Sequence, residues 1–347
     1  MPADLRQSSD EEPGYTRRKF GRGYAYYDVA GRKVEDDKVK ARLNALAVPP
    51  AYRNVWYCKD PRGHIQATGY DDKNRKQYRY HEEYRLHAEA DKFARTAEFG
   101  KALPRIRKRV ARDLRKRKLS RDTVLAAVVR LLDTAHLRIG NRRYARENKS
   151  FGLTTLRVRH VERLKTRLKV NFRGKHGIER DVTITEPALV RILSDCQDLP
   201  GQELFQYLTE DGRQRTIDSA DVNDYIREIS GTDFTAKKFR TWGASKLAME
   251  EILKARKSRR PLSVANLVEP VSEALGNTPA VTRSSYVHPL LVEAVKAEPL
   301  DPLKGVKIVH RKRSGLSRAE TQLLAFLEGD KRSMRRRLLD VLRVERG

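Results

Sequence analysis

The clearest pattern of hydrophobic and polar residues lies in LKVNFR, residues 168–173. Its apolar side chains occupy every second position, which is typical of a strand that buries one face. Gly174 and Gly177 follow, and they favour a hairpin turn that holds Lys175 and His176. The flanking stretches TLRVRHVERLKTR and IERDVTIT alternate in a similar way. The pattern therefore predicts a short sheet that contains this hairpin.

Residues 15–85 consist of short alternating runs, such as GYAYYDVAG and RKQYRYH, separated by the turn sequences DPRG and DDKN. Such runs between turn signals predict a small β-rich domain. One helix is expected from about Asp36 to Leu46, because Pro49 and Pro50 prevent its continuation. Ten of the fourteen tyrosines lie within the first 84 residues. They can pack within the sheet or, among Arg and Lys, form a face that contacts nucleic-acid bases.

The pattern changes near Glu82, where charged, helix-forming residues begin. The stretch SRDTVLAAVVRLLDTAHLRIG predicts a buried helix that Ser120 or Asp122 caps and that Gly140 ends. From Glu186 onward the pattern is mostly helical. The fold expected is therefore α+β, with a small β-rich N-terminal domain before a larger, mainly helical domain that includes a short sheet. The expected divisions are a disordered leader at 1–14, the β-rich domain at 15–88 and the helical domain at 89–347, with the boundary near 85–92.

The net charge of the chain indicates which class of partner it binds. The chain has 347 residues, 35% of them charged, and a formal net charge of +28 that is spread from Arg17 to Arg346. A charge of this size attracts a polyanion, most commonly nucleic acid. A ribosomal protein or a protein that binds an anionic membrane surface would also fit. Hydrophobic residues, at 39%, suffice for a folded core.

The sequence gives no indication of a disulfide framework, a zinc site, a signal peptide, a membrane span or a nucleotide-hydrolysis site. Cys58 and Cys196 are too few for a disulfide framework or a regular zinc site, so both are expected to be reduced core residues. The first residues lack the apolar segment of a signal peptide, and the longest apolar run, TVLAAVV, is too short to cross a membrane. No Walker-type glycine-rich loop is present, so nucleotide hydrolysis is not expected. These features favour a cytoplasmic protein.

Tyr286 has an unusual setting for a core tyrosine, because it lies in RSSYVHP, a polar, turn-like stretch. Cleavage of a phosphodiester by a protein nucleophile needs such a tyrosine, arginines that stabilise charge on phosphorus, and a lysine that protonates the leaving oxygen. Arg138, Lys175 and Arg240 are candidates for these roles. Each alone carries little weight in a chain with 74 Lys and Arg residues, so the combination matters.

The blocks RIGN, YARENKSFGLTTL, FRGK, KKFRTWGAS and LGNTPAVTRSSYV resemble, in order and approximate spacing, the motifs of type IB DNA topoisomerases of the small poxvirus-like branch found in bacteria. The blocks LAVPPAYRNVW and GHIQATGYDDKNRKQYRYH resemble the family's small clamp domain. The resemblance runs from about Gly14 to about Ala297. It implies a catalytic domain of the topoisomerase IB and tyrosine recombinase type.

The resemblance also implies a role for each matching residue. Tyr286 would form a 3′-phosphotyrosyl bond, Arg138 and Arg240 would bind the scissile phosphate, and Lys175 would protonate the 5′ oxygen. Asn277 stands where the family usually has histidine, and its amide can still donate a hydrogen bond to a phosphate oxygen. The residues expected to contact DNA are Gln77, Tyr78, Tyr80, Asn141, Tyr144 and Lys237.

The activity implied is relaxation of supercoiled duplex DNA by a monomer at the nucleoid, with no cofactor, nucleotide, metal or membrane. A tyrosine recombinase is the enzymatic alternative, but it typically carries HxxR where this chain has KKFR, residues 237–240. A basic, non-enzymatic DNA-binding protein would bind DNA without a covalent adduct. A C-terminal helix, about Arg332–Val344, could pack on the core or touch DNA, and its apolar stripe favours packing.

Overall fold

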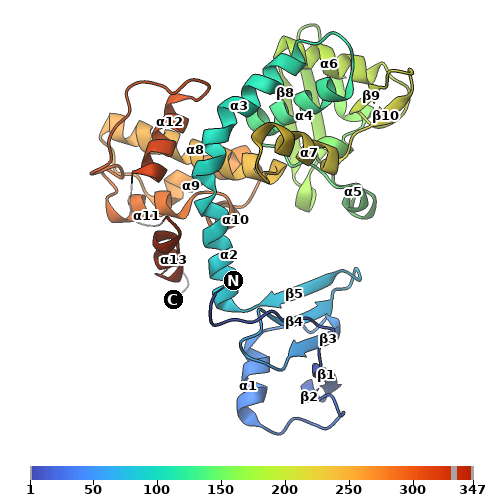
Figure 1. Cartoon of the computed structure of the whole chain (residues 1–347), viewed down its shortest axis with the longest axis vertical. Helices are drawn as coiled ribbons and strands as arrows, with labels where there is room; N and C mark the ends of the chain where they lie inside the picture. The colour runs from blue at the N-terminus through green and yellow to red at the C-terminus, as the bar shows by residue number, and fades with distance from the viewer. Residues whose placement is uncertain (1, 330–333, 345–347) are drawn as a thin grey trace. The chain divides into compact units, whose positions relative to one another are not determined.

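The computed structural model describes residues 2–329 and 334–344 (Figure 1). The chain separates into two compact units, one of Met1–Lys92 with Leu342–Gly347 and the other of Phe93–Val341. The division falls close to the predicted boundary at residue 88, but the end of the chain joins the first unit and not the second. Within the described residues, no helix is long and apolar enough to cross a bilayer.

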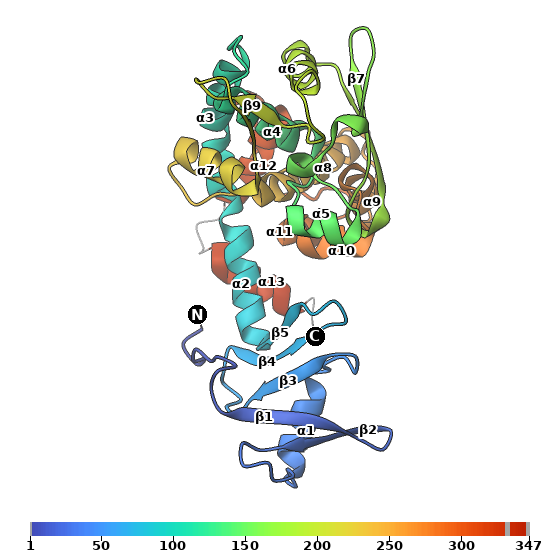
Figure 2. The same ribbon diagram turned by 90° about the vertical axis from the view of Figure 1, so that its right-hand side faces the viewer.

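The first unit is built on an antiparallel sheet, as the short alternating runs predicted. Its strands follow the order β2-β1-β3-β4-β5, so that β2 and β5 form the two edges (Figure 2). The helix α1 (Asp37–Ala45) begins where Asp36 accepts hydrogen bonds from the N–H groups of Lys38 and Val39. The strands are β1 (Gly14–Phe20), β2 (Gly23–Tyr27), β3 (Arg53–Cys58), β4 (Ile65–Tyr70) and β5 (Lys76–Tyr80).

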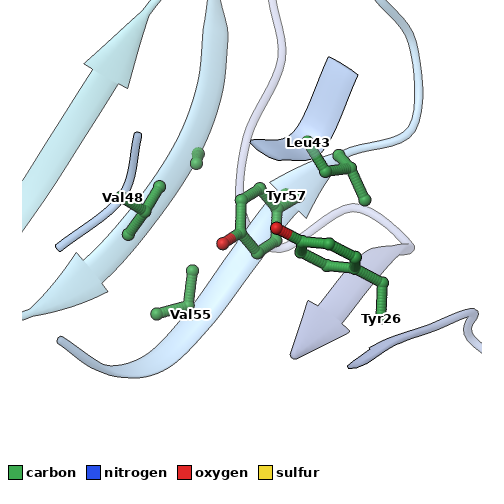
Figure 3. Packing of buried hydrophobic residues seen from close by; sticks show 6 residues of the cluster. Tyr26, Leu43, Val48, Val55 and Tyr57 are labelled. Atoms are coloured by element: carbon green, nitrogen blue, oxygen red, sulfur yellow. The ribbon is translucent and has the colours of Figure 1, made fainter. Parts of the chain in front are cut away.

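The core of this unit explains part of the tyrosine content. The rings of Tyr26 and Tyr57 meet edge to face with centroids 5.4 Å apart, and Leu43, Val48 and Val55 surround them (Figure 3). Buried rings in this arrangement stabilise the fold by more than the burial of their apolar area alone would. These tyrosines therefore belong to sheet packing, one of the two roles that the sequence left open.

The stretch 2–14 was predicted to be a disordered leader, and this prediction is wrong. Leu5 is 8% exposed, and Arg6 pairs with Gly63 in an isolated β-bridge. The Ser8 hydroxyl donates to the Ile65 carbonyl at 3.0 Å. The indole of Trp56 donates to the Glu12 carbonyl at 2.9 Å. The segment has little apolar periodicity because side chain to backbone hydrogen bonds, with partners some fifty residues away, hold it in place.

The second unit is mainly helical with short sheets, as predicted (Figure 1). Its helices are α3 (Thr96–Leu114), α4 (Arg121–Ala135), α5 (Arg142–Asn148), α6 (Pro187–Gln197), α7 (Ser219–Ser230), α8 (Ala236–Ser258), α9 (Val264–Leu275), α10 (Pro279–Ser285), α11 (Pro289–Ala297) and α12 (Arg318–Glu328). Its sheets are β6 (Val161–Arg163), β7 (Leu168–Arg173) and β8 (Glu179–Ile184), and the pair β9 (Gln206–Leu208) and β10 (Gln214–Thr216). The helices α2 (Glu82–Ala94) and α13 (Met334–Val344) each include a point where the two units divide.

Helix α4 starts as predicted but ends earlier. Its N-cap is Ser120, whose hydroxyl accepts from the Thr123 N–H, and its central residues are buried. The helix stops at Ala135 because His136 takes a left-handed conformation with φ 52°, whereas the sequence predicted an end at Gly140. A left-handed residue other than glycine costs backbone energy. The carbonyl of His136 accepts a hydrogen bond from Arg240.

The alternation in β7 is confirmed, because Leu168, Val170 and Phe172 are buried between exposed neighbours. A 3-10 turn at Lys175–Gly177 joins β7 to β8, so the hairpin is also confirmed. Both cysteines are free and buried, as expected.

The predicted C-terminal helix, about Arg332–Val344, begins at residues that lie outside the described ones, since the description resumes at Met334. In α13, Leu338 and Leu342 are buried, which supports packing of the stripe. Val344 is 78% exposed and does not belong to the buried face.

Candidate active site

Four of the five candidate catalytic residues come from segments that meet around one side of α8. Arg138 follows the end of α4, and Arg240 lies in the second turn of α8. Asn277 follows Gly276, the C-cap of α9, and Tyr286 is the C-cap of α10. Gly243 of α8 leaves space for the ring of His136, since a Cβ there would lie 2.5 Å from that ring, and Ser245 lies against the chain after Tyr286. The Ser245 hydroxyl accepts from the His288 N–H at 3.1 Å and thereby holds that chain.

Arg240 is fixed beneath the tyrosine by the backbone. It is only 4% exposed, its Nη1 donates to the His136 carbonyl, and its Nη2 donates to the Leu275 carbonyl at 3.1 Å. The left-handed turn of His136 aims that carbonyl at the guanidinium. Burial, and then the neighbouring Arg138, lower the pKa of Arg240 to about 10, so it remains a cation at neutral pH.

Tyr286 lies against this guanidinium. The central carbon of the Arg240 guanidinium is 4.9 Å from the centre of the Tyr286 ring, and the tyrosine is half-buried. Burial raises the pKa of the phenol, but the positive charges of Arg240 and Arg138 outweigh it and lower the pKa below its ordinary value. A phenol in this environment loses its proton more readily than one in water, which is the requirement for an oxygen nucleophile.

Asn277 connects Arg138 to the same site. Arg138 Nη2 donates to Asn277 Oδ1 at 2.5 Å. A guanidinium can only donate, so the amide oxygen must face Arg138 and the amide nitrogen must face away. Asn277 Nδ2 is buried and has no hydrogen-bond partner among the described residues. The site therefore contains a donor that is ready for an oxygen atom of a ligand.

Lys175 stands apart from these four residues. It is exposed in the turn between β7 and β8, and among the described residues it forms no hydrogen bond or ion pair with the other candidates. The structure thus brings together Arg138, Arg240, Asn277 and Tyr286, whereas Lys175 lies outside this cluster, in the turn between β7 and β8.

Sequence reasoning missed Arg180, on β8. Its Nη2 donates to the Ala274 carbonyl at 3.0 Å, just before the turn that holds Asn277. Burial, and then Arg138, lower the pKa of Arg180. The signal was present in the strand ERDVTI, because Arg180 shares the inward face with Val182 and Ile184. A charged residue on the apolar face of a strand marks a polar partner or a ligand.

The partners of Arg138, Arg180 and Arg240 are one amide oxygen and backbone carbonyls. No carboxylate in the described part of the chain pairs with these three guanidiniums. Three cations near one another without a carboxylate repel each other, and an anion such as a phosphate relieves that repulsion. The arrangement can therefore bind a phosphate and present a phenol to it.

The aromatic residues predicted to contact DNA lie on the edge strand of the first unit. Tyr78 and Tyr80 are 43% and 37% exposed, and their rings stack with centroids 5.8 Å apart. Tyr84 on α2 continues the stack at 5.3 Å from Tyr80. Gln77, beside them, donates its amide to Asp71 at 3.1 Å. Exposed stacked rings are suited to contact with bases, which separates these tyrosines from the packed ones.

The other three predicted DNA contacts lie in the second unit. Asn141 caps α5, because its Oδ1 accepts from the Tyr144 N–H at 3.0 Å, so it has a structural role that the sequence analysis did not foresee. Tyr144 is half-buried in the first turn of α5, and Lys237 is exposed in the first turn of α8. The N-cap Asn141 thereby fixes the backbone of the first turn of α5, which carries Tyr144.

Comparison with known proteins assigns the family. Residues 78–297 match the model described as "Eukaryotic DNA topoisomerase I, catalytic core", and residues 23–71 match "Bacterial DNA topoisomerase IB, N-terminal domain". DNA topoisomerase 1B of Acanthamoeba polyphaga mimivirus is 34% identical over 297 residues, which cover 82% of this chain and 88% of the viral protein.

More distant relatives agree with this assignment. DNA topoisomerase 1B of Vaccinia virus (strain Copenhagen) is 22% identical over 269 residues, which cover 75% of this chain and 80% of the viral protein. DNA topoisomerase 1 of Mycosarcoma maydis is 23% identical over 180 residues, which cover 47% of this chain and 18% of the fungal protein. The chain therefore belongs to the type IB DNA topoisomerases, is related to the mimivirus and poxvirus members, and has DNA topoisomerase activity.

Proposed function

We propose that this chain relaxes supercoiled duplex DNA by reversible cleavage of one strand, with Tyr286 as the nucleophile. The observation that carries the proposal is the contact of the Tyr286 ring with the buried guanidinium of Arg240, in a cluster that lowers the pKa of the phenol. The Tyr286 oxygen attacks the scissile phosphorus, the bond from phosphorus to the 5′ oxygen breaks, and the 3′ phosphate becomes joined to the tyrosine. The freed 5′ end rotates and then attacks in reverse.

Arg138, Arg240 and Asn277 stabilise the charge that builds up on the non-bridging oxygens. The two arginines act as fixed cations, and Asn277 Nδ2 supplies a neutral donor. Their partners hold them in place before DNA binds, so little reorganisation is needed during the reaction. Lys175 gives its proton to the departing 5′ oxygen as general acid.

DNA is held by the positive charge of the chain and by the predicted contacts. The stacked Tyr78 and Tyr80, with Gln77, contact the duplex from the first unit. Tyr144, Asn141 and Lys237 contact it from the second unit. One chain supplies all five candidate catalytic residues, so a monomer is the proposed active species. Binding that rests on phosphate contacts weakens steeply as salt is added.

Relaxation is expected to proceed without ATP and in the presence of EDTA. The phosphotyrosine bond retains the energy of the phosphodiester, and the guanidiniums supply the positive charge that a metal would otherwise provide. The measurement is a plasmid-relaxation time course in EDTA with no nucleotide, analysed as a ladder of topoisomers. A requirement for ATP, or complete loss of activity in EDTA that magnesium restores, would contradict the mechanism.

Asn277 offers a test that separates its two functional atoms. Asn277→Ala removes both, and we expect cleavage to slow about fivefold, since a neutral hydrogen bond contributes about 1 kcal/mol. Asn277→Asp keeps an oxygen for Arg138 but loses the donor and adds a negative charge near the phosphate, so its loss should be larger. Single-turnover cleavage of a short duplex measures both. If Asn277→Asp cleaves as fast as the parent chain, Asn277 only holds Arg138 and its donor has no role.

A further inference from the structure

Arg180 links the hairpin that carries Lys175 to the turn that carries Asn277. Its side chain starts on β8, opposite Phe172 of β7, and its Nη2 reaches the Ala274 carbonyl at 3.0 Å. The residues at the two ends of this link are ninety-four positions apart in the sequence. Among the described residues, Arg180 has no carboxylate partner, so a backbone carbonyl is the group that fixes its guanidinium.

Gly276 leaves space for this side chain, and Gly174 lies within van der Waals reach of its stem. Gly276 has φ 58°, and a Cβ there would overlap Arg180 Nη1 and lie 3.2 Å from Arg180 Cδ. At the other end, a Cβ on Gly174 would lie 3.4 Å from Arg180 Cγ. Gly174 is the residue immediately before Lys175. The stem of Arg180 therefore lies against the start of the turn, and its guanidinium lies against the segment that leads to Asn277.

The position of Arg180, half-buried and beside Arg138, is electrostatically unfavourable for the fold. The pKa of Arg180 is lowered by burial first and by the charge of Arg138 second. A half-buried cation beside another cation costs stability, and an apolar residue at this inward-facing position of β8 would avoid that cost. A fork of fixed donors can, however, dock a hairpin at a defined distance from the site, which an apolar side chain cannot do.

We propose that Arg180 is a positioning residue for the general acid: it docks the β7–β8 hairpin on the Ala274–Gly276 segment so that Lys175 reaches the 5′ oxygen of the scissile phosphate. The inference rests on the proposed function, in which Lys175 supplies that proton. In this role Arg180 keeps its bond to the Ala274 carbonyl and acts through Lys175.

Arg180→Met tests this role, because methionine fills much of the same space without the guanidinium. Single-turnover cleavage is measured on two duplexes, one with the ordinary 5′ oxygen and one with sulfur at that single bridging position. A thiolate leaves without a proton, since a thiol has a pKa of about 8.5, whereas an alkoxide needs one. We expect cleavage of the oxygen substrate to slow about 10²-fold, as for partial loss of a general acid, and cleavage of the sulfur substrate to change little.

Three further variants make the outcome decisive. Lys175→Ala should show the same selective loss, and the double variant should be no slower than Lys175→Ala alone, because both changes remove one function. Arg167→Met removes the same charge from the exposed turn at the other end of β7 and should leave both rates unchanged. Arg180→Lys, with thermal unfolding recorded for every variant, covers the case in which methionine destabilises the fold.

Each other result overturns the proposal in a recognisable way. Equal slowing on both substrates would assign Arg180 to the phosphate or to general stability. No slowing on either substrate would remove it from the reaction. If sulfur fails to restore cleavage in Lys175→Ala itself, the general-acid assignment is wrong, and the failure then lies in the proposed function and not in the docking contact.

Discussion

Replacing Tyr286 by phenylalanine is expected to abolish DNA cleavage and relaxation while leaving DNA binding intact. The change removes one oxygen and keeps the ring that lies 4.9 Å from the Arg240 guanidinium carbon, so the packing of the site should survive. No other described tyrosine is placed among the three guanidiniums. Loss of the attacking atom from an otherwise complete site costs on the order of 10⁶-fold in rate.

The measurement is single-turnover cleavage with parallel DNA binding at fixed salt. Tyr207→Phe provides a matched control, because Tyr207 is also half-buried in the second unit but lies on β9. It should relax plasmid at the parent rate. Residual relaxation by Tyr286→Phe above background would show that another group attacks phosphorus.

Arg240→Ala is expected to have the second largest effect, slowing cleavage by about 10³-fold or more. A fixed cation on a transferring phosphoryl group is worth about 10³–10⁵ in rate, and Arg240 is the most buried of the cluster. Arg240→Lys should recover little, because a lysine has one ammonium and cannot bond to the His136 and Leu275 carbonyls in the same fork geometry. Full activity in Arg240→Lys would show that charge alone is needed.

The same variant should change the pH dependence in a defined direction. Arg240 is the largest influence that lowers the pKa of Tyr286, so its removal raises that pKa. At a given neutral pH a smaller fraction of the phenol is then ionised. The rising limb of a rate against pH profile should move to higher pH in Arg240→Ala than in the parent chain. A profile that does not move would separate Arg240 from the ionisation of Tyr286.

Local patterns in the sequence predicted the hairpin of Lys175 and the buried helix α4, but not α10, because the stretch before Tyr286 was interpreted as turn-like and is helical at Pro279–Ser285. The period-two run at 168–172 gave the buried face of β7, and the small residues of RTWGAS fit a helix that other segments approach closely. The catalytic residues could be named because their blocks resemble a family. Their convergence could not be derived from the sequence, because it depends on contacts between segments far apart, such as that of Arg138 with Asn277.

The features that the sequence did not predict also depend on contacts between segments that are far apart in the chain. Helix α4 ends at Ala135, before the glycine signal at Gly140, and the left-handed His136 that follows makes a tertiary contact with Arg240 that the sequence does not reveal. Residues 2–14 are ordered by hydrogen bonds to distant strands and have no pattern of their own. Arg180 was visible as a charge on an apolar face, but its partner at Ala274 was not.

The most direct test of the central claim is to identify the residue that becomes bonded to DNA. A duplex whose 5′ fragment is too short to remain paired traps the covalent intermediate, and digestion followed by mass spectrometry locates the modified peptide. The account predicts a phosphodiester between the 3′ phosphate of the cleaved strand and the oxygen of Tyr286. An adduct on any other side chain, or one formed through the 5′ end of the break, would contradict it.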